Sequence, residues 1–228
     1  MAMVSDYQEE TMGRLRSFSF FQGLDEPTLS EISRLAQKRS YARGEIISLE
    51  GERCTTAYFI IEGQVKVNKV SLEGREQVMV RLGPGDAFCL VPVFDGGPNP
   101  ATVEAFTEVL LFAFRKGDFL RLVRRYPEVA LAVLEHLSAK LRHFVALVED
   151  LSLYTVEARL SRLLLRLSTG EDVVHRCVTQ QEMAAELGTV REVIGRALRD
   201  LEREGIIHFD RHRIVIVDRA ALEAKAMV

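Results

Sequence analysis

Two short helices separated by a glycine are predicted in residues 179–205, which read TQQEMAAELGTVREVIGRALRDLEREG. Residues 179–182 (TQQE) have the spacing of a capping box, in which a threonine and a glutamate each accept a hydrogen bond from the other's backbone amide. Gly188 suits the left-handed conformation that ends such a helix. Residues 189–192 (TVRE) repeat the spacing, so we expect a second capping box to open the second helix.

The second helix separates apolar from basic residues. Its apolar side is expected to hold Val193, Ile194, Ala197, Leu198 and Leu201, and its exposed side Arg191, Arg196, Arg199 and Arg203. Two apolar runs then flank residues 210–212 and predict a β-hairpin wing over 206–217. An ordinary helical pair with a solvated basic face is the alternative. The two caps, the glycine turn, the early arginines and the wing together favour a DNA-binding helix-turn-helix.

In the first half of the chain, the residue pattern changes near Gly44 from one typical of helices to one typical of strands. Before it, residues 14–40 are predicted to form short helical segments, with Pro27 early in one of them. After it, short runs rich in Ile, Val and Phe are separated by glycines, at 45–49, 57–61, 64–70, 77–82 and 109–114. Such a pattern predicts a small antiparallel β-roll, or jelly roll. The fold class is therefore α+β.

A long helix is expected from Pro127. Leu134, Leu141 and Val148 recur every seven residues, and Leu137, Phe144 and Leu151 repeat that spacing three residues later. This a/d seam favours pairing with the same helix of a second copy, although a helix packed on its own domain is the alternative. The expected division is a sensor domain at 1–126, a dimerisation helix at 127–153 and a winged helix-turn-helix at 154–228.

Composition narrows the class of protein. The formal net charge is −3, so DNA contact must come from a local basic face. No uninterrupted apolar run reaches the about 18 residues of a membrane span, and the polar N-terminus carries no secretion signal. The three cysteines, Cys54, Cys89 and Cys177, form no CxxC pair, which argues against a disulfide framework or a zinc or iron–sulfur site. A cytoplasmic location is expected.

The chain resembles the superfamily of the cyclic-AMP receptor protein and the fumarate–nitrate regulator. The resemblance is carried by QEMA (181–184) and LGTVREVIGR (187–196), and upstream by FQGL (21–24), RGE (43–45), YFIIEG (58–63) and GD (85–86). It implies a β-roll sensor, a dimerising helix and a winged helix-turn-helix in a transcription regulator that is not an enzyme. The arginine and glutamate of 191–192, followed by Gly195 and Arg196, are closer to the cyclic-AMP receptor type.

The resemblance also implies DNA contacts and partners. The residues assigned to DNA are Thr179, Gln180, Thr189, Arg191, Glu192, Arg196 and Arg199. The expected partners are a second copy of the chain, RNA polymerase, and a palindromic DNA site with half-sites similar to TGTGA. No membrane partner is expected.

The sensor domain departs from the cyclic-nucleotide pattern. Members that bind cyclic AMP carry Gly-Glu where this chain has Cys89 and Leu90, and Arg-Ser where it has Asn99 and Pro100. No lysine or arginine lies between Arg81 and Arg115 to neutralise a phosphate. Cyclic AMP and cyclic GMP are therefore not expected as effectors.

The effector stays unknown at this level. Residues 88–94 are apolar and could line a pocket for an apolar molecule or haem, or could simply fill the core. The candidate lining is Phe88, Cys89, Leu90, Asn99, Ala101, Phe144 and Val148. Cys89 could be a haem or redox ligand, although a buried cysteine often acts as a small hydrophobe.

Other chemistries have less support. His136 and His143 share one helix face and could be axial ligands, yet packed or solvated histidines are commoner. An iron–sulfur cluster of the fumarate–nitrate type is held by N-terminal cysteines. Residues 1–53 contain no cysteine, so such a cluster is not expected. A metal-dependent enzyme on a jelly roll is disfavoured because residues 44–114 contain no histidine. A regulator that has lost sensing stays open as the alternative.

Overall fold

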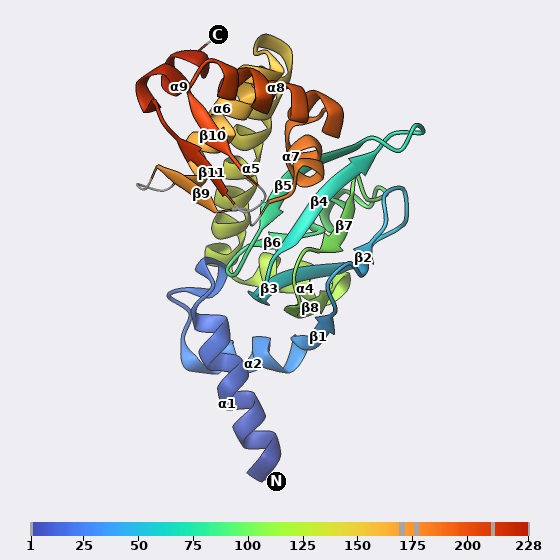
Figure 1. The fold of residues 1–228 in the computed structure, drawn as a ribbon. Helices are drawn as coiled ribbons and strands as arrows, with labels where there is room; N and C mark the ends of the chain where they lie inside the picture. Colours follow the sequence, from blue (N-terminus) through green and yellow to red (C-terminus); the bar gives the residue numbers. More distant parts are fainter. Residues whose placement is uncertain (1, 169–171, 176–177, 211–212, 228) are drawn as a thin grey trace. The chain divides into compact units, whose positions relative to one another are not determined.

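The computed structural model describes residues 2–168, 172–175, 178–210 and 213–227, and the chain divides into two compact units (Figure 1). The first unit holds residues 1–69 and 80–142, and the second holds 70–79 and 143–228. Each unit has its own hydrophobic core. Within the described ranges, no helix combines the length and the apolar character needed to span a bilayer.

Helical segments begin the first unit: α1 (Ala2–Arg16), the 3-10 turn η1 (Ser19–Phe21) and α2 (Glu26–Leu35). The start of α2 is capped by Asp25, whose carboxylate accepts a hydrogen bond of 3.0 Å from the Thr28 amide. Pro27 lies in the first turn, where a missing amide hydrogen costs nothing. The helix predicted after Pro27 is confirmed.

The β-roll consists of two sheets with the strand orders β1-β8-β3-β6 and β2-β7-β4-β5. The first sheet contains β1 (Gln37–Tyr41), β3 (Thr56–Glu62), β6 (Ala87–Phe88) and β8 (Val109–Arg115). The second contains β2 (Ile46–Ser48), β4 (Val65–Val70), β5 (Glu76–Leu82) and β7 (Thr102–Ala105). Antiparallel registers join β1 to β8, β8 to β3, β3 to β6, β2 to β7 and β7 to β4. The predicted antiparallel roll is confirmed.

Strand β3 is buried on both faces. Ala57 and Phe59 point into a core cluster shared with the helices, whereas Tyr58 and Ile60 point into the cluster between the sheets. This alternation follows from the period of two in a β-strand. The turn after β3 requires Gly63, because a Cβ there would lie 2.0 Å from the Glu108 carbonyl oxygen.

Residues 37–41 form a strand, so the helical prediction for 14–40 is wrong over this part. The sequence of β1, QKRSY, lacks the alternating apolar residues that mark a half-buried strand. Its conformation comes from pairing, since Gln37 lies opposite Ala113 and Tyr41 lies opposite Val109 on β8. A polar edge strand of this kind leaves little trace in the sequence.

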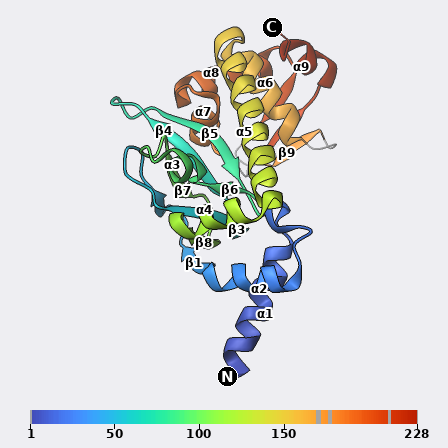
Figure 2. The ribbon, with the colours of Figure 1, turned by 180° about the vertical axis from the view of Figure 1, so that it is seen from behind.

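Three helices complete the first core. They are α3 (Leu90–Asp95), α4 (Lys116–Arg125) and the start of α5 (Pro127–Leu153). Figure 2 shows α4 beside the first sheet, where it contacts β3 and β8. Phe119 of α4 and Val129 of α5 are buried in the same cluster as Phe59. The long helix predicted from Pro127 is confirmed.

The second unit contains helices α6 (Val156–Leu167), α7 (Gln180–Leu187), α8 (Arg191–Arg203) and α9 (Arg219–Lys225). They accompany a sheet of order β10-β11-β9, made of β9 (Val173–His175), β10 (Ile207–Phe209) and β11 (Arg213–Ile216). The predicted wing hairpin is present, with Ile207 opposite Ile216, while residues 211–212 of its turn lie outside the described residues. Strand β9 adds a third strand that the sequence did not indicate.

Candidate DNA-binding interface and sensor site

Helices α7 and α8 form the candidate reading head, which is the helix pair expected to contact DNA. Its first helix, α7, starts at the predicted capping box. The Glu182 amide donates to the Thr179 hydroxyl at 3.1 Å, and the Thr179 amide donates to the Glu182 carboxylate at 2.7 Å. Gly188 ends the helix with φ of +64°. Both local predictions are confirmed, so α7 begins and ends where the sequence indicates.

The second predicted capping box is wrong. Helix α8 begins at Arg191, and its N-cap is Val190, which makes no side-chain cap. Thr189 belongs instead to the end of the preceding helix, because its amide donates to the Ala184 carbonyl at 2.9 Å. The glycine turn uses the residue that the spacing assigned to the next cap. The helix still forms, because its apolar side is buried.

The two sides of α8 differ as expected. Ile194, Ala197, Leu198 and Leu201 are buried in the core of the unit. The opposite side is exposed and carries Arg191, Glu192, Arg196, Arg199 and Arg203.

The exposed charges of α8 differ in their partners. Arg203 forms an ion pair with Asp200 at 2.9 Å. Among the described residues, the side chains of Arg191, Glu192, Arg196 and Arg199 make no hydrogen bond or ion pair. This helix therefore presents charged groups that the described part of the chain leaves unpaired.

The remaining candidate contacts lie beside this helix. Gln180 is half-buried, and its Oε1 would lie 3.5 Å from a Cβ at Gly195. Thr179 is exposed, although its hydroxyl is engaged by Glu182, and Thr189 is half-buried at the turn. The wing is fixed to the C-terminal end of α8, because the Phe209 amide donates to the Glu202 carboxylate at 3.2 Å.

The apolar seam expected on α5 divides into two parts. Leu134, Leu141 and Val148 are 60%, 65% and 62% exposed. Leu137 is partly buried against the core of its own unit, Phe144 is half-buried and Leu151 is 39% exposed. Leu131 and Val145 are exposed on the side of Leu134 and Leu141. The exposed heptad series is therefore 131, 134, 138, 141, 145 and 148.

The candidate effector residues of the roll lie in the first unit but face different ways. Phe88 stacks on Tyr58 with ring centroids 5.0 Å apart in the cluster between the sheets. Leu90 is buried in the cluster shared with the helices. Asn99 and Ala101 are buried, and the side-chain amide of Asn99 donates to the Ser48 hydroxyl and to the Leu49 carbonyl.

The other two candidates of that set, Phe144 and Val148, belong to the second unit. For residues 88–94 the sequence left open a pocket wall or core filling. Most of this stretch lies in helix α3 (Leu90–Asp95), with Leu90 and Val93 in the core.

Both candidate histidine ligands contact backbone carbonyls. The Nε2 atom of His136 lies 3.0 Å from the Ala87 oxygen, and that of His143 lies 2.9 Å from the Met79 oxygen. His136 also packs against the Phe20 ring at 5.2 Å between centroids. Over the described ranges, His, Cys, Asp and Glu side chains form no group of three that could hold a metal ion. Cys177 lies outside the described residues.

Comparisons with known proteins agree with this arrangement. Residues 38–126 match the family of the cyclic nucleotide-binding domain, and residues 158–225 match the Crp-like helix-turn-helix domain. The transcriptional regulator LdrP of Thermus thermophilus is 30% identical over 196 residues, which cover 82% of this chain and 96% of that protein. The chain belongs to the CRP/FNR family of transcription regulators.

One further sequence relative and one solved structure are similar to this CRP/FNR regulator. The CRP-like cAMP-activated global transcriptional regulator of Mycobacterium tuberculosis is 28% identical over 213 residues, covering 90% of this chain and 95% of that one. A CRP/FNR-family regulator from Eubacterium rectale shares the fold, with a TM-score of 0.79 at 24% identity and coverage of 92% and 99%. The helix-turn-helix of α7 and α8 is thus a DNA-binding domain of CRP type.

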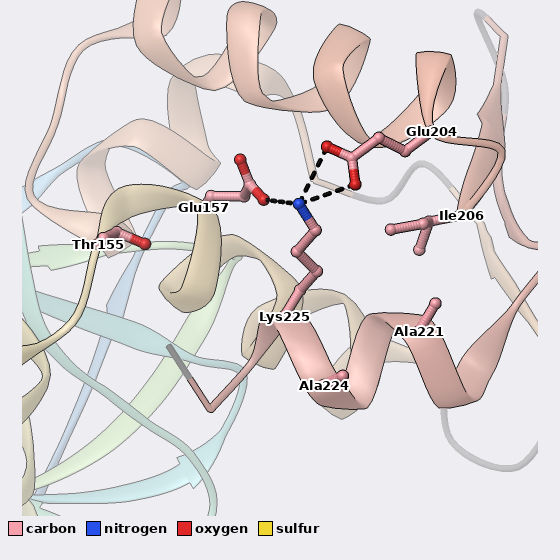
Figure 3. A pocket seen from close by; sticks show the side chains of 7 residues that line it. All are labelled: Thr155, Glu157, Glu204, Ile206, Ala221, Ala224 and Lys225. Atoms are coloured by element: carbon pink, nitrogen blue, oxygen red, sulfur yellow. Dashed lines mark hydrogen bonds and ion pairs between the residues drawn. The ribbon is translucent and has the colours of Figure 1, made fainter.

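This CRP/FNR chain also has a pocket in the second unit. It has a volume of about 760 Å³ and is lined by Thr155, Glu157, Glu204, Ile206, Ala221, Ala224 and Lys225 (Figure 3). The Lys225 ammonium lies 2.7 Å from Glu157 and 2.8 Å from Glu204. These ion pairs connect α6, the end of α8 and α9. Local sequence patterns gave no sign of this contact, because it joins three separate segments.

Proposed function

We propose that this chain is a homodimeric, sequence-specific regulator whose α8 enters the major groove of a palindromic DNA site. The observation that carries the proposal is the exposed face of α8, where Arg191, Glu192 and Arg196 have no partner among the described residues. Arginine pairs with the O6 and N7 atoms of guanine, and glutamate accepts from the N4 amino group of cytosine. Half-sites similar to TGTGA, about one helical turn apart, match these roles.

Contacts to the DNA backbone are assigned to Thr179, Gln180, Thr189 and Arg199. They lie at the start of α7, at the turn and farther along α8, so they flank the residues assigned to bases. Phosphate contacts fix the register of a protein on the duplex and carry no sequence information directly. Removal of one of these side chains should weaken binding to all sequences alike.

Dimerisation is assigned to α5. Residues 131, 134, 141, 145 and 148 form an exposed apolar stripe at heptad spacing, which a second copy of the helix would cover. The half-buried Leu137 and Phe144, with Leu151, would border that stripe. A two-fold dimer supplies two reading heads for the two halves of a palindrome.

The sensor roll is proposed to respond to something other than a cyclic nucleotide. Asn99 stands where the arginine that neutralises a phosphate is expected, and its side-chain amide already donates to Ser48 and Leu49. Cys89 and Leu90 replace the Gly-Glu pair of the cyclic-AMP pattern. An apolar molecule, haem or a redox signal is the class of effector that this environment favours. An effector-independent regulator is the alternative. We further propose that the protein acts in the cytoplasm and that RNA polymerase is one of its partners.

Selection from random double-stranded DNA tests the proposal, using the purified full-length protein. The expected product is a palindrome of TGTGA-like halves that binds one dimer. An enriched pool without two-fold symmetry would contradict the dimeric arrangement. Comparison of operator affinity with and without cell extract separates an effector-gated regulator from an effector-independent one.

A further inference from the structure

Two cysteines of the β-roll, Cys54 and Cys89, meet although they are distant in the sequence. Cys54 precedes β3 and Cys89 follows β6, and these strands pair through Tyr58 with Phe88. Both cysteines are partly buried against the same core cluster. A hydrogen bond joins their side chains, and the Ser48 hydroxyl contacts both. The two thiols therefore share one small site.

The loops that carry this site are tied together. The Gly51 backbone amide donates to the backbone carbonyl of Asn99 at 2.9 Å, and the Asn99 backbone amide donates to the Glu52 carbonyl at 2.8 Å. In its protonated form, the Cys54 thiol donates to the Thr56 carbonyl at 3.2 Å. Within the described part of the chain, Cys89 is the one non-glycine residue with positive φ, at +58°. Strained backbone of this kind is concentrated at functional sites.

The two sulfur atoms have different chemical properties. The hydrogen bond from the Cys89 thiol lowers the pKa of Cys54 to about 6, so Cys54 is mainly a thiolate at neutral pH. Donation of that bond, burial and the neighbouring Cys54 charge raise the pKa of Cys89. The thiolate is the nucleophilic form of cysteine. The pair therefore consists of one reactive sulfur and one protonated partner.

We propose that Cys54 and Cys89 form a redox-active pair that hydrogen peroxide converts into a disulfide inside the sensor roll. The Cys54 thiolate attacks one peroxide oxygen, so that an S–O bond forms, the O–O bond breaks and hydroxide leaves to be protonated to water. Cys54 becomes a sulfenic acid, which removes its negative charge from beside Cys89. The Cys89 sulfur then attacks Cys54, so that the S–S bond forms and the oxygen leaves with the Cys89 proton as water.

In total, two thiols and one hydrogen peroxide give one disulfide and two waters, and a dithiol reduces the disulfide back to the two thiols. Disulfides in reducing compartments are usually transient and redox-sensing. The assignment of this reaction as the regulatory input rests on the proposed function, because it requires that the roll controls DNA binding. The thiol chemistry itself does not depend on that role.

The test uses the reduced full-length Cys177→Ser variant, treated with hydrogen peroxide at increasing concentration. We expect loss of both remaining thiols, a mass decrease of two hydrogen atoms and a cross-linked peptide that contains Cys54 and Cys89. The Cys89→Ser variant should instead accumulate a sulfenic acid at Cys54, which dimedone traps. The matched Cys54→Ser variant should not react at low peroxide. Oxidation without the Cys54–Cys89 cross-link would overturn the proposal.

Operator affinity of the same samples tests the regulatory role. Reduced and oxidised forms should differ by about 5–150-fold, the usual range of coupling between two sites. The Cys54→Ser protein should bind equally with and without peroxide. A cross-link that leaves operator affinity unchanged would overturn the role of the pair as the input. Protein that binds no DNA in either the reduced or the oxidised form would contradict the proposed function, while the cross-link would still support the thiol chemistry.

Discussion

Thr179 and Glu182 hydrogen-bond to each other in both directions at the start of α7. The Glu182 amide donates to the threonine hydroxyl at 3.1 Å, and the Thr179 amide donates to the glutamate carboxylate at 2.7 Å. Two amides that the helix itself cannot satisfy are thereby paired. Because α7 packs against α8, this cap helps to hold the reading head in place.

Thr179→Ala should remove half of this cap. We expect local opening of α7 to become easier by about 0.5–2 kcal/mol, the usual cost of an N-cap threonine replaced by alanine. Hydrogen exchange of the α7 amides, followed by peptide mass spectrometry, measures the change. Thr179→Ser keeps a hydroxyl and is the matched control. Equal protection in the alanine and wild-type proteins would show that the cap contributes nothing.

Arg196→Ala should weaken specific DNA binding on the order of 1–3 kcal/mol and relax the preference at one base pair. The reason is the loss of a two-point contact with a guanine edge. Binding to the selected operator and to single-base variants measures both effects. Arg121→Ala on α4 is the control. Arg121 is exposed and pairs with Asp118 of the same helix, and this helix belongs to the first unit and not to the DNA-binding unit. Uniform weakening on every sequence would instead assign Arg196 to a phosphate.

Leu141→Asp should convert the dimer into a monomer. Leu141 is 65% exposed in the single chain, and the proposed partner helix would bury the new carboxylate without a counter-charge. Sedimentation measures the oligomeric state, and operator binding should collapse because two reading heads are needed. Ala139→Asp, at an exposed position of α5 outside the stripe, should remain a dimer. A dimeric Leu141→Asp protein that still binds DNA would place the interface elsewhere.

The helix pair α7 and α8 could be predicted from local sequence signals. Contacts between distant segments could not be predicted in this way. The capping box and Gly188 act within one helix, so their spacing alone identified α7. The seam of α5 was ambiguous because Leu137 and Phe144 also recur every seven residues. The series of Leu137, Phe144 and Leu151 is apolar throughout, whereas the exposed series of 131, 138 and 145 is interrupted by Ser138. The sequence pattern therefore favoured the first series. The packing of Leu137 against the core of the first unit distinguishes its side of the helix from the exposed one.

The roll illustrates the same limit. Strand β1 is polar, and its conformation depends on pairing with β8, far along the chain. The site formed by Cys54, Cys89 and Ser48 requires loops from three separate parts of the sequence to close on each other. No spacing rule connects those residues. Cys89 could be suspected from its apolar surroundings, but its partner could not be identified before the fold was known.

His136 should make the first unit less stable in mild acid. Burial lowers the pKa of His136 below 6.5, with a smaller contribution from Lys140, while Asp86 and the Ala87 carbonyl act in the opposite direction. Unfolded chains then bind the proton more readily than the folded one. The stability from neutral His136 is therefore present above about pH 6.5 and is lost as pH falls through the lowered pKa. Urea unfolding at pH 7.5 and 5.5 measures the change.

His136→Gln provides the comparison for that pH effect. Its stability relative to wild type at pH 7.5 reports only the loss of packing against Phe20 and of the contact with Ala87. Between pH 7.5 and 5.5 the variant should lose less stability than wild type, because it has no group to protonate there. A variant with the same loss as wild type would exclude His136 as a source of the acid sensitivity.

Cyclic AMP and cyclic GMP should not bind in the roll. A buried phosphodiester carries a charge, and burial of a charge without a partner costs several kcal/mol. No lysine or arginine lies between Arg81 and Arg115, and the side-chain amide of Asn99 already donates to Ser48 and Leu49. Base contacts alone are too weak to offset that cost. Titration calorimetry at millimolar nucleotide should therefore give no saturable heat, and operator affinity should stay unchanged.

The cAMP-activated regulator of Mycobacterium tuberculosis is the positive control for that titration, since it shares 28% identity with this chain over 213 residues. Under the same conditions it should give a binding isotherm where this chain gives none. Fresh reductant should be present throughout, so that oxidation of Cys54 and Cys89 cannot alter the roll. Saturable micromolar binding of either nucleotide would mean that a cation from elsewhere in the dimer reaches the phosphate. The roll would then be a cyclic-nucleotide sensor after all.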